Sequence, residues 1–478
     1  MKHVLIIFFD QLRYDCIGAN GNPYIQTPAM DALAAESIRF DRCVTPSPVC
    51  VPARLSLLSG QYPARTGNSN NNPRLMYEGK GFYATMTGAG YDSCCIGKMH
   101  HVWDKKGKLG FNKRLIQEPQ LDDDYLEFIQ NSPYKHVFDP NGQRADMYYV
   151  PQVSQLPAEY HPTTWVAERS MDFLDECDPT KDNVFLFTSL FHPHPPFSPP
   201  APWNKIYRTR EGIEPFHPKS DDPITFAPLL YDRFTLERLG ISELDLARLR
   251  NFYYACVTFA DYQISRLIAK LKEKGMYDDT LIVVTSDHGE MLGDFGTMGK
   301  RTMFNGANHI PLMMKVPGHA PEVRSDVCSL VDIAPTLLTW AGIGYDKAEF
   351  DGIDLLHERH TEVYSQYDCG IKGTYMVADD RDKLIWNARE QLYYYLRDGD
   401  ESVNAYKKYA DTPRVTALRE KLDAYVASDR GIPGKSKIPA NNPFRLADND
   451  CQHTKEKELA RVPAPYRLTL SKPKKSED

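Results

Sequence analysis

The sequence predicts an α/β fold in which a large, mixed and mostly parallel sheet is sandwiched by helices, with a smaller C-terminal α+β subdomain. Residues 3–9, 184–190 and 280–285 are nearly continuous apolar runs, which are typical of strands buried on both faces of a parallel sheet. Helical patterns lie between these runs, as expected for βαβ units. Later in the chain the strand-like pieces become short and close together. We therefore place a large α/β domain at residues 1–350 and a subdomain with a small antiparallel sheet and a helix at 351–478.

The first half of the chain has a clear helical signal at residues 28–38. Apolar side chains recur there at helical spacing, after Thr27 as a plausible cap and Pro28 at the first helical position. The other elements expected in this half are a helix at 53–58 whose N-terminus points at residue 50, a helix and a short strand within 83–97, a polar insertion up to about residue 160, and a helix at 165–174.

The second half is dominated by a long helix, expected from Ser242 to Lys274. Its apolar residues form one stripe, and Gly275 follows as a stop signal. The segment 200–240 is irregular and is expected to cover the cleft. The remaining elements expected are a strand at 312–316, a helix at 333–340, strands at 375–378, 383–386 and 391–396, and a helix at 412–427.

Composition and charge exclude several classes of protein. The chain has 42% apolar and 25% charged residues, as globular proteins do, and 478 residues fit one large and one smaller domain, or three small ones. A net charge of -7 gives no reason to expect a nucleic-acid partner. The ten cysteines show no CxxC or Cys/His spacing, which argues against a disulfide scaffold and a structural zinc site.

No membrane partner is expected, because no segment approaches the roughly 20 apolar residues of a transmembrane helix. The apolar run at residues 4–9 is short and meets Asp10 without a cleavage site for a signal peptide. We expect a cytoplasmic protein, or a periplasmic one if a leader was trimmed.

Two of the predicted strands end in side chains that bind metals. Asp10 and Gln11 follow the first strand, and Asp287 and His288 follow the strand at 280–285. Ligands of open α/β sheets bind at the carboxyl ends of strands. Carboxylate and amide oxygens suit calcium or magnesium, and the imidazole leaves manganese or zinc possible.

The segment 50–67, CVPARLSLLSGQYPARTG, is the most distinctive stretch of the chain. Pro52 and Arg54 follow Cys50 at positions two and four, and Gly60 comes after a run of small residues and leucines. This pattern resembles the signature of the type I sulfatases, in which a maturation enzyme oxidises the cysteine to formylglycine. Ala53 stands where serine is commonest in that family. The alternative is that Cys50 is a buried thiol at the start of a helix.

The resemblance extends over roughly residues 1–345 and implies an alkaline phosphatase-like fold. Lys98 and His100 in GKMH, His194 before PPF, and Lys300 in MGKRTMF match positions of the family's active-site residues. It further implies that Asp10, Gln11, Asp287, His288 and the residue made from Cys50 together hold one divalent cation. Calcium is expected there, with magnesium or manganese as alternatives. Residues 290–300 resemble the common EMLGDHGLWGK but carry Phe295, Thr297 and Met298, so the substrate-facing side departs from the pattern.

Each of these residues has a physical role in cleaving a sulfate monoester. The cation, Arg54, Lys98 and Lys300 supply positive charge around the sulfate oxygens. A hydrated aldehyde at residue 50 attacks sulfur through one hydroxyl and later expels sulfate by re-forming the carbonyl, whereas a serine would trap sulfate as a stable ester. Arg54 also fits a role in stabilising the aldehyde hydrate. We assign His194 to protonating the leaving alcohol and His100 to assisting hemiacetal breakdown, and the two could exchange roles.

The predicted function is that of a sulfuric ester hydrolase acting on a sulfated saccharide or a small sulfate ester. GKMH followed by His101 is similar to choline-sulfate hydrolases as well as to carbohydrate sulfatases. One alternative is a phosphonate monoester or phosphodiester hydrolase, because members of the same superfamily use formylglycine with an Asp, Gln, Asp, His metal set. GKMH favours a sulfatase. A second alternative is a metal-dependent binder of sulfated ligands without catalysis, in which Cys50 stays a thiol.

Overall fold

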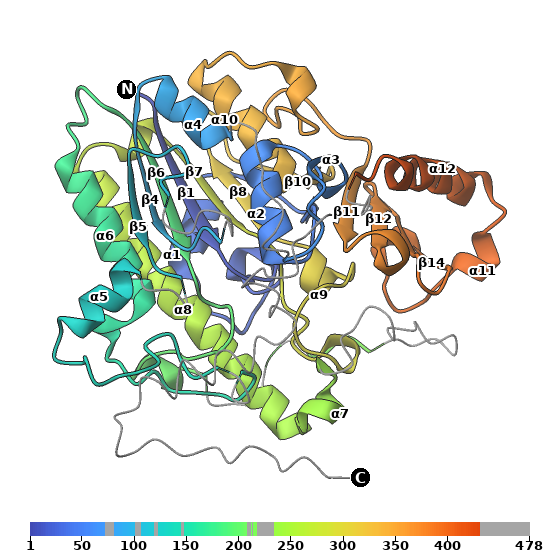
Figure 1. The fold of residues 1–478 in the computed structure, drawn as a ribbon, viewed down its shortest axis with the longest axis horizontal. Coiled ribbons are helices and arrows are strands. Elements are labelled where there is room, and N and C mark those ends of the chain that lie inside the picture. The colour runs from blue at the N-terminus through green and yellow to red at the C-terminus, as the bar shows by residue number, and fades with distance from the viewer. Residues whose placement is uncertain are drawn as a thin grey trace, which may run out of the picture.

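The computed structural model describes residues 1–71, 81–100, 107–118, 123–144, 148–207, 212, 214–217 and 234–430 (Figure 1). Its centre is an eight-stranded sheet with the order β5-β4-β6-β1-β7-β8-β2-β9. The strands are β1 (His3–Phe9), β2 (Ile38–Phe40), β4 (Tyr91–Gly97), β5 (Lys113–Ile116), β6 (Asn183–Leu190), β7 (Thr280–Ser286), β8 (Leu312–Lys315) and β9 (Glu322–Arg324). Strands β5, β4, β6, β1 and β7 are parallel, β8 is antiparallel to β7 and β2, and β9 is parallel to β2. The predicted mixed, mostly parallel sheet is confirmed.

Strand β1 is buried on both faces because its apolar side chains alternate between two cores. Leu5, Ile7 and Phe9 pack on one side of the sheet, and their neighbours along the strand pack on the other. Burial of such a side chain stabilises the fold by about 1.5–3 kcal/mol. Helices α1 (Pro28–Ala34), α6 (Pro162–Glu176) and α8 (Glu243–Glu273) cover the first face, and α2 (Cys50–Ser59), α4 (Phe82–Gly88) and α10 (Ile333–Ala341) cover the second (Figure 1). The predicted sandwich is therefore confirmed.

The long helix α8 begins and ends where its sequence predicts. The Ser242 side chain accepts a hydrogen bond from the Asp245 N–H as its N-cap, and Gly275 takes the left-handed conformation beyond its C-terminus, with φ of 68°. Midway along α8, Asp261 is buried and accepts hydrogen bonds from the Ala29 N–H at 3.0 Å and the Met30 N–H at 2.8 Å. One helix thus caps the N-terminus of another.

Burial raises the pKa of Asp261 to about 7. The folded state therefore holds a proton that the unfolded chain has lost, so stability falls as the pH rises from about 4 to about 7. Asp261→Asn removes this titration. We expect the unfolding midpoint of the variant to rise relative to the parent between pH 5 and pH 8, by an amount equivalent to at most about 4 kcal/mol. If the unfolding midpoints of the two proteins instead changed with pH in parallel, the Asp261 carboxyl would not titrate in that range.

The C-terminal part forms a second, antiparallel sheet beside the large one (Figure 1). Its strands, in order, are β11 (Val363–Tyr367), β12 (Thr374–Ala378), β13 (Lys383–Asn387) and β14 (Leu392–Leu396). Helix α12 (Pro413–Ala427) packs Leu418 and Leu422 against Val377 and Leu384 of this sheet. The antiparallel C-terminal sheet is confirmed, although the sequence does not predict β11. The domain boundary at residue 350 stays a prediction.

Several short elements differ from the sequence prediction. Ile38 is not the end of a helix, because α1 ends at Ala34 and Ile38 begins β2. The stretch expected to be a polar insertion contributes strand β5 and helix α5 (Asp124–Gln130). The remaining short α-helices and strands of the described residues are α3 (Pro63–Thr66), α7 (Leu236–Leu239), α9 (Asn305–Asn308), α11 (Tyr406–Tyr409), and the paired strands β3 (Cys43–Val44) and β10 (Cys328–Ser329). His101, most of the segment 200–240 and residues 431–478 lie outside the described residues.

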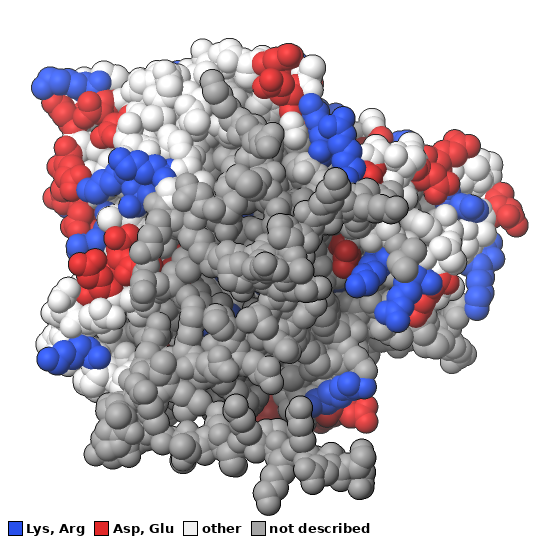
Figure 2. Space-filling model, viewed as in Figure 1, with Lys and Arg blue, Asp and Glu red and all other residues white. Residues whose placement is uncertain are grey.

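The structure also gives the length and apolar character of the helices and the distribution of charge on one face. None of the helices in the described ranges combines the length and apolar character needed to cross a bilayer. On the face in Figure 2, acidic and basic side chains are interspersed wherever the chain is described. On this face, the charge of the described residues is therefore of mixed sign.

Candidate active site

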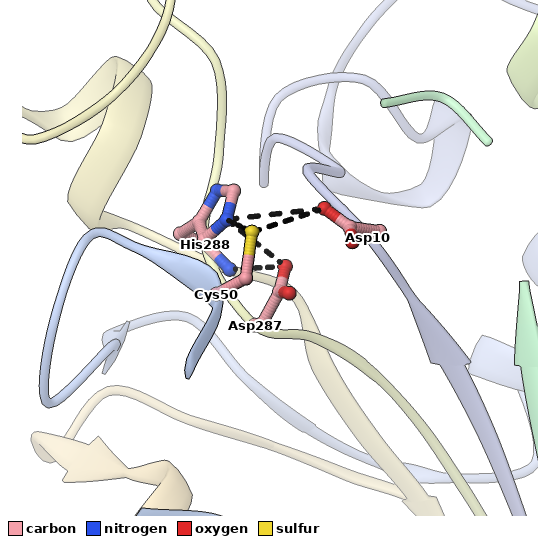
Figure 3. Close-up of side chains that lie close together, drawn as sticks. All are labelled: Asp10, Cys50, Asp287 and His288. Atoms are coloured by element: carbon pink, nitrogen blue, oxygen red, sulfur yellow. Dashed lines mark hydrogen bonds and ion pairs between the residues drawn. The ribbon is translucent and has the colours of Figure 1, made fainter. Parts of the chain in front are cut away.

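Four predicted metal ligands meet at the carboxyl ends of the central strands (Figure 3). Asp10 follows β1, Asp287 and His288 follow β7, and Cys50 is the first residue of α2. One ligand atom of each lies within 4.8 Å of the others, and all four residues are buried. The Cys50 sulfur lies 3.3 Å from Nε2 of His288 and 3.8 Å from a carboxylate oxygen of Asp10. Two carboxylates, an imidazole and a thiol in one buried place form a possible cation site.

Local structure explains why these residues meet. Strands β1 and β7 are paired neighbours with Phe9 opposite Ser286, so the residues that follow them emerge together. Cys50 begins α2 after an extended Val49, which places the first turn of the helix at the same edge of the sheet. The Asn71 side-chain oxygen accepts the Val51 N–H at 2.9 Å and satisfies one free donor of that turn.

Gln11 is held from both ends of its amide. Its nitrogen donates to the Glu290 carboxylate, and its oxygen accepts from Nζ of Lys300 at 2.8 Å. Its backbone is left-handed, with φ of 72°, and its N–H donates to Asp287 at 3.0 Å. Glu290 is fully buried and also accepts from Tyr149 at 3.3 Å. Glu290 therefore leaves the amide oxygen of Gln11 facing Lys300 and the cluster.

Arg54 bridges the two aspartates from one helical turn beyond Cys50. Its Nε donates to Asp287 at 2.8 Å, one Nη donates to Asp10 at 3.3 Å, and the other donates to the Lys98 carbonyl at 2.7 Å. The guanidinium also lies 4.9 Å from the ring centroid of Phe8. Although burial opposes a charged guanidinium, the Asp287 and Asp10 carboxylates raise the pKa of Arg54. These hydrogen bonds hold the positive charge of Arg54 in a fixed position beside the cluster.

Two lysines add positive charge around the sulfur. Lys98 forms a buried ion pair with Asp10, and Nζ of Lys300 lies 2.9 Å from the Cys50 sulfur and 3.1 Å from Nε2 of His288. Burial alone would raise the pKa of the Cys50 thiol, but Lys300, Lys98 and His288 lower it well below its usual value. Burial and the Cys50 sulfur raise the pKa of Asp10, yet Lys98, His194 and Arg54 outweigh them and lower it. The site therefore favours anions.

Two histidines complete the surroundings of Cys50. The side chains of His100 and His194 both lie near the Cys50 thiol. Nδ1 of His194 lies 2.7 Å from the Pro195 carbonyl oxygen, and its Nε2 lies 3.3 Å from the Tyr148 hydroxyl. Burial, with Lys300 and Lys98 adding to it, lowers the pKa of His194 well below its usual value.

The structure thus brings all ten sequence-predicted residues to one place. They are Asp10, Gln11, Cys50, Arg54, Lys98, His100, His194, Asp287, His288 and Lys300. Their individual roles stay predictions. Sequence reasoning missed Tyr148, Glu290 and Asn71. Glu290 had a signal, because it is an acid two residues beyond His288, whereas the other two carry no local pattern.

Comparison with known proteins gives relatives over most of the chain. The chain is 28% identical to an arylsulfatase of Clostridium perfringens, with 88% of this chain and 93% of that protein covered. It is also 28% identical to a choline-sulfatase of Rhizobium meliloti, with 88% and 85% covered. Among solved structures, the phosphonate monoester hydrolase SpPMH of Silicibacter pomeroyi superposes with a TM-score of 0.75 at 25% identity, covering 90% of this chain and 96% of that one. The alkaline phosphatase-like fold is confirmed.

A family model gives the assignment directly. The model described as Sulfatase matches residues 2–343, which contain β1, α2, β7 and every side chain of the cluster. The two sulfatase relatives each match 88% of the chain, a larger share than the family model covers. The chain belongs to the sulfatase family.

Proposed function

We propose that this sulfatase cleaves a sulfate monoester with a formylglycine made from Cys50 and one divalent cation held by Asp10, Gln11, Asp287 and His288. The supporting observation is the cluster itself: a buried cysteine at a helix N-terminus lies within 4.8 Å of two carboxylates and an imidazole. Arg54, Lys98 and Lys300 lie around it. Cationic groups fixed in a buried place stabilise a developing anion far better than water does.

The ligand atoms fit a hard divalent cation. Two carboxylates and one amide supply oxygen, which calcium prefers, and the oxygen of a formylglycine would replace the sulfur of residue 50. We propose calcium, with magnesium or manganese as alternatives that the imidazole of His288 tolerates. A bound cation would neutralise sulfate oxygens and favour the deprotonated form of a hydroxyl at residue 50.

The basic side chains of the chain itself hold the sulfate. Lys300 and Lys98 approach residue 50 from different segments of the chain. Arg54 forms ion pairs with both Asp10 and Asp287 and so holds their carboxylates in place. An anion bound there would exchange its hydration shell for these fixed charges. Together with Lys98, Arg54 also helps to keep Asp10 ionised, which the cation requires.

The two histidines handle protons. Nδ1–H of His194 donates to the Pro195 carbonyl, so Nε2 is the atom that can carry a proton to a leaving alcohol. A bound sulfate would raise the pKa of His194 from its low value by placing negative charge beside it. His100, whose side chain also lies near residue 50, is assigned to breakdown of the hemiacetal.

Conversion of Cys50 would need a formylglycine-generating maturation enzyme that reads Cys50, Pro52 and Arg54. Cys50 and Arg54 are only 1% and 2% exposed in the folded chain. The enzyme would therefore act on this segment before it packs against the sheet.

The substrate class we propose is a sulfated saccharide or a small sulfate ester. The metal set and the likeness to SpPMH favour phosphonate monoesters as the second candidate. Purified enzyme should be assayed against sulfated sugars, choline sulfate, an aryl sulfate and an aryl phosphonate monoester. We expect the highest kcat/KM with a sulfate ester. A clear preference for the phosphonate would place the chain in the other branch of the superfamily.

A further inference from the structure

A buried carboxylate lies behind the loop that carries Lys98 and His100. Strands β4 and β5 are parallel neighbours with Gly97 opposite Ile116, so the residues after each strand continue side by side. One oxygen of Glu118 accepts the Met99 N–H at 3.0 Å and the His100 N–H at 2.9 Å. Glu118 is only 6% exposed, so its charge faces the loop and not solvent.

The loop needs such an acceptor because its backbone is unusual. Gly97 has φ of 103°, and a Cβ there would lie 1.9 Å from the Ser189 carbonyl oxygen. His100 has φ of 54°, a left-handed conformation that costs a non-glycine residue about 1–2 kcal/mol. Two successive N–H groups directed at one carboxylate offset that cost, since hydrogen bonds to a charged acceptor are about twice as strong as neutral ones.

Glu118 is itself fixed in place. Arg114, on β5 and 2% exposed at its side chain, donates to the same carboxylate oxygen at 3.2 Å. The Glu118 N–H donates to Asp123, the N-cap of α5, at 2.6 Å. A residue that is held at both its carboxylate and its backbone can impose its geometry on a loop. A solvent-exposed carboxylate without such contacts would instead move with the loop.

We propose that Glu118 is a positioning residue for His100: it locks the left-handed backbone at residue 100 and thereby directs the imidazole onto residue 50. The inference rests on the proposed function, because it requires that His100 acts at residue 50. Glu118 does not touch the reacting atoms itself. Its effect therefore passes through His100 and disappears when the imidazole is absent.

A double-mutant cycle on matured enzyme tests this with a sulfate-ester assay. Glu118→Ala should lower kcat about 10²-fold and leave KM within about threefold, because misplacing a catalytic group by 1 Å can cost that much. Glu118→Gln keeps an acceptor oxygen and should lose less than about tenfold. In the His100→Ala background, each substitution at residue 118 should change kcat by less than about twofold. Glu176→Ala removes an exposed ion pair with Lys113 of β5 and is the matched control. It should leave both kcat and KM unchanged.

The outcomes separate the two proposals. If His100→Ala alone leaves kcat unchanged, the role assigned to His100 is wrong, whatever Glu118 does. If His100→Ala impairs turnover but the loss at residue 118 is equally large in both backgrounds, Glu118 supports the fold only and the inference is overturned. Should circular dichroism show Glu118→Ala to be unfolded, the Gln variant carries the same cycle, with a loss of about three- to tenfold expected only when His100 is present.

Discussion

Replacement of Cys50 by alanine should lower kcat for a sulfate ester by at least about 10³-fold, because it removes the nucleophile. Binding of a sulfate ester should persist. Arg54, Lys98 and Lys300 are held by partners other than Cys50, namely Asp287, Asp10 and Gln11. Steady-state kinetics measure the loss of turnover, and calorimetry of sulfate-ester binding to the inactive variant measures whether binding persists.

A matched control comes from another buried thiol. Cys177 is the C-cap residue of α6. Its thiol contacts the Phe173 carbonyl and Asp92, at the opposite end of the sheet from the site. Cys177→Ala should keep full kcat, with at most a small loss of stability. Cys50→Ser should take up sulfate once, as an ester of the introduced hydroxyl, and then stop, since serine lacks the second hydroxyl that expels sulfate. Continued turnover by Cys50→Ala would remove residue 50 from the chemistry.

Loss of the divalent cation should have the second largest effect. Asp10→Asn keeps the shape of the side chain but removes one of two carboxylate charges, and it leaves Lys98 and Arg54 facing a neutral amide. We expect a loss of at least about 10²-fold in kcat and in cation affinity. Elemental analysis of the purified protein and restoration of chelated enzyme with calcium, magnesium or manganese are the measurements.

Asp261→Asn is the matched control for that substitution. It makes the same chemical change at a buried aspartate that caps α1 and belongs to no metal cluster among the described residues. Cation content and kcat should stay at the parent level. Full activity of chelated protein, with no metal detected, would exclude the proposed use of a cation.

The sequence predicts most of the fold where signals are long or chemically distinctive. Strands β1 and β7 are long apolar runs that end in acids, and α8 carries its stripe between Ser242 and Gly275. Strands β2 and β9, the last two at one side of the sheet, have only three residues each, which is too few for a periodic pattern to emerge. The helical pattern before β2 therefore runs on to include Ile38. The pairing that defines β11 likewise leaves no local pattern.

The residues of the site likewise fall into two groups: those that a local sequence pattern identifies and those that only the folded structure brings into place. The signature at Cys50 and the paired ligands after β1 and β7 identify its centre from local patterns. Glu118 and Tyr148 reach it only through the folded sheet: Glu118 because β5 lies beside β4, and Tyr148 because its loop returns to His194. Residues that support others through backbone contacts leave no pattern in the chain.

The most direct test is mass spectrometry of the tryptic peptide 43–54 from enzyme made together with a maturation enzyme. This peptide contains Cys43 as well as Cys50, so alkylation of Cys43 is an internal control. The expected peptide has one alkylated cysteine and an aldehyde at residue 50, in which an oxygen replaces the sulfur and two hydrogens are lost. Two alkylated cysteines in a preparation that turns over sulfate esters would contradict a formylglycine mechanism.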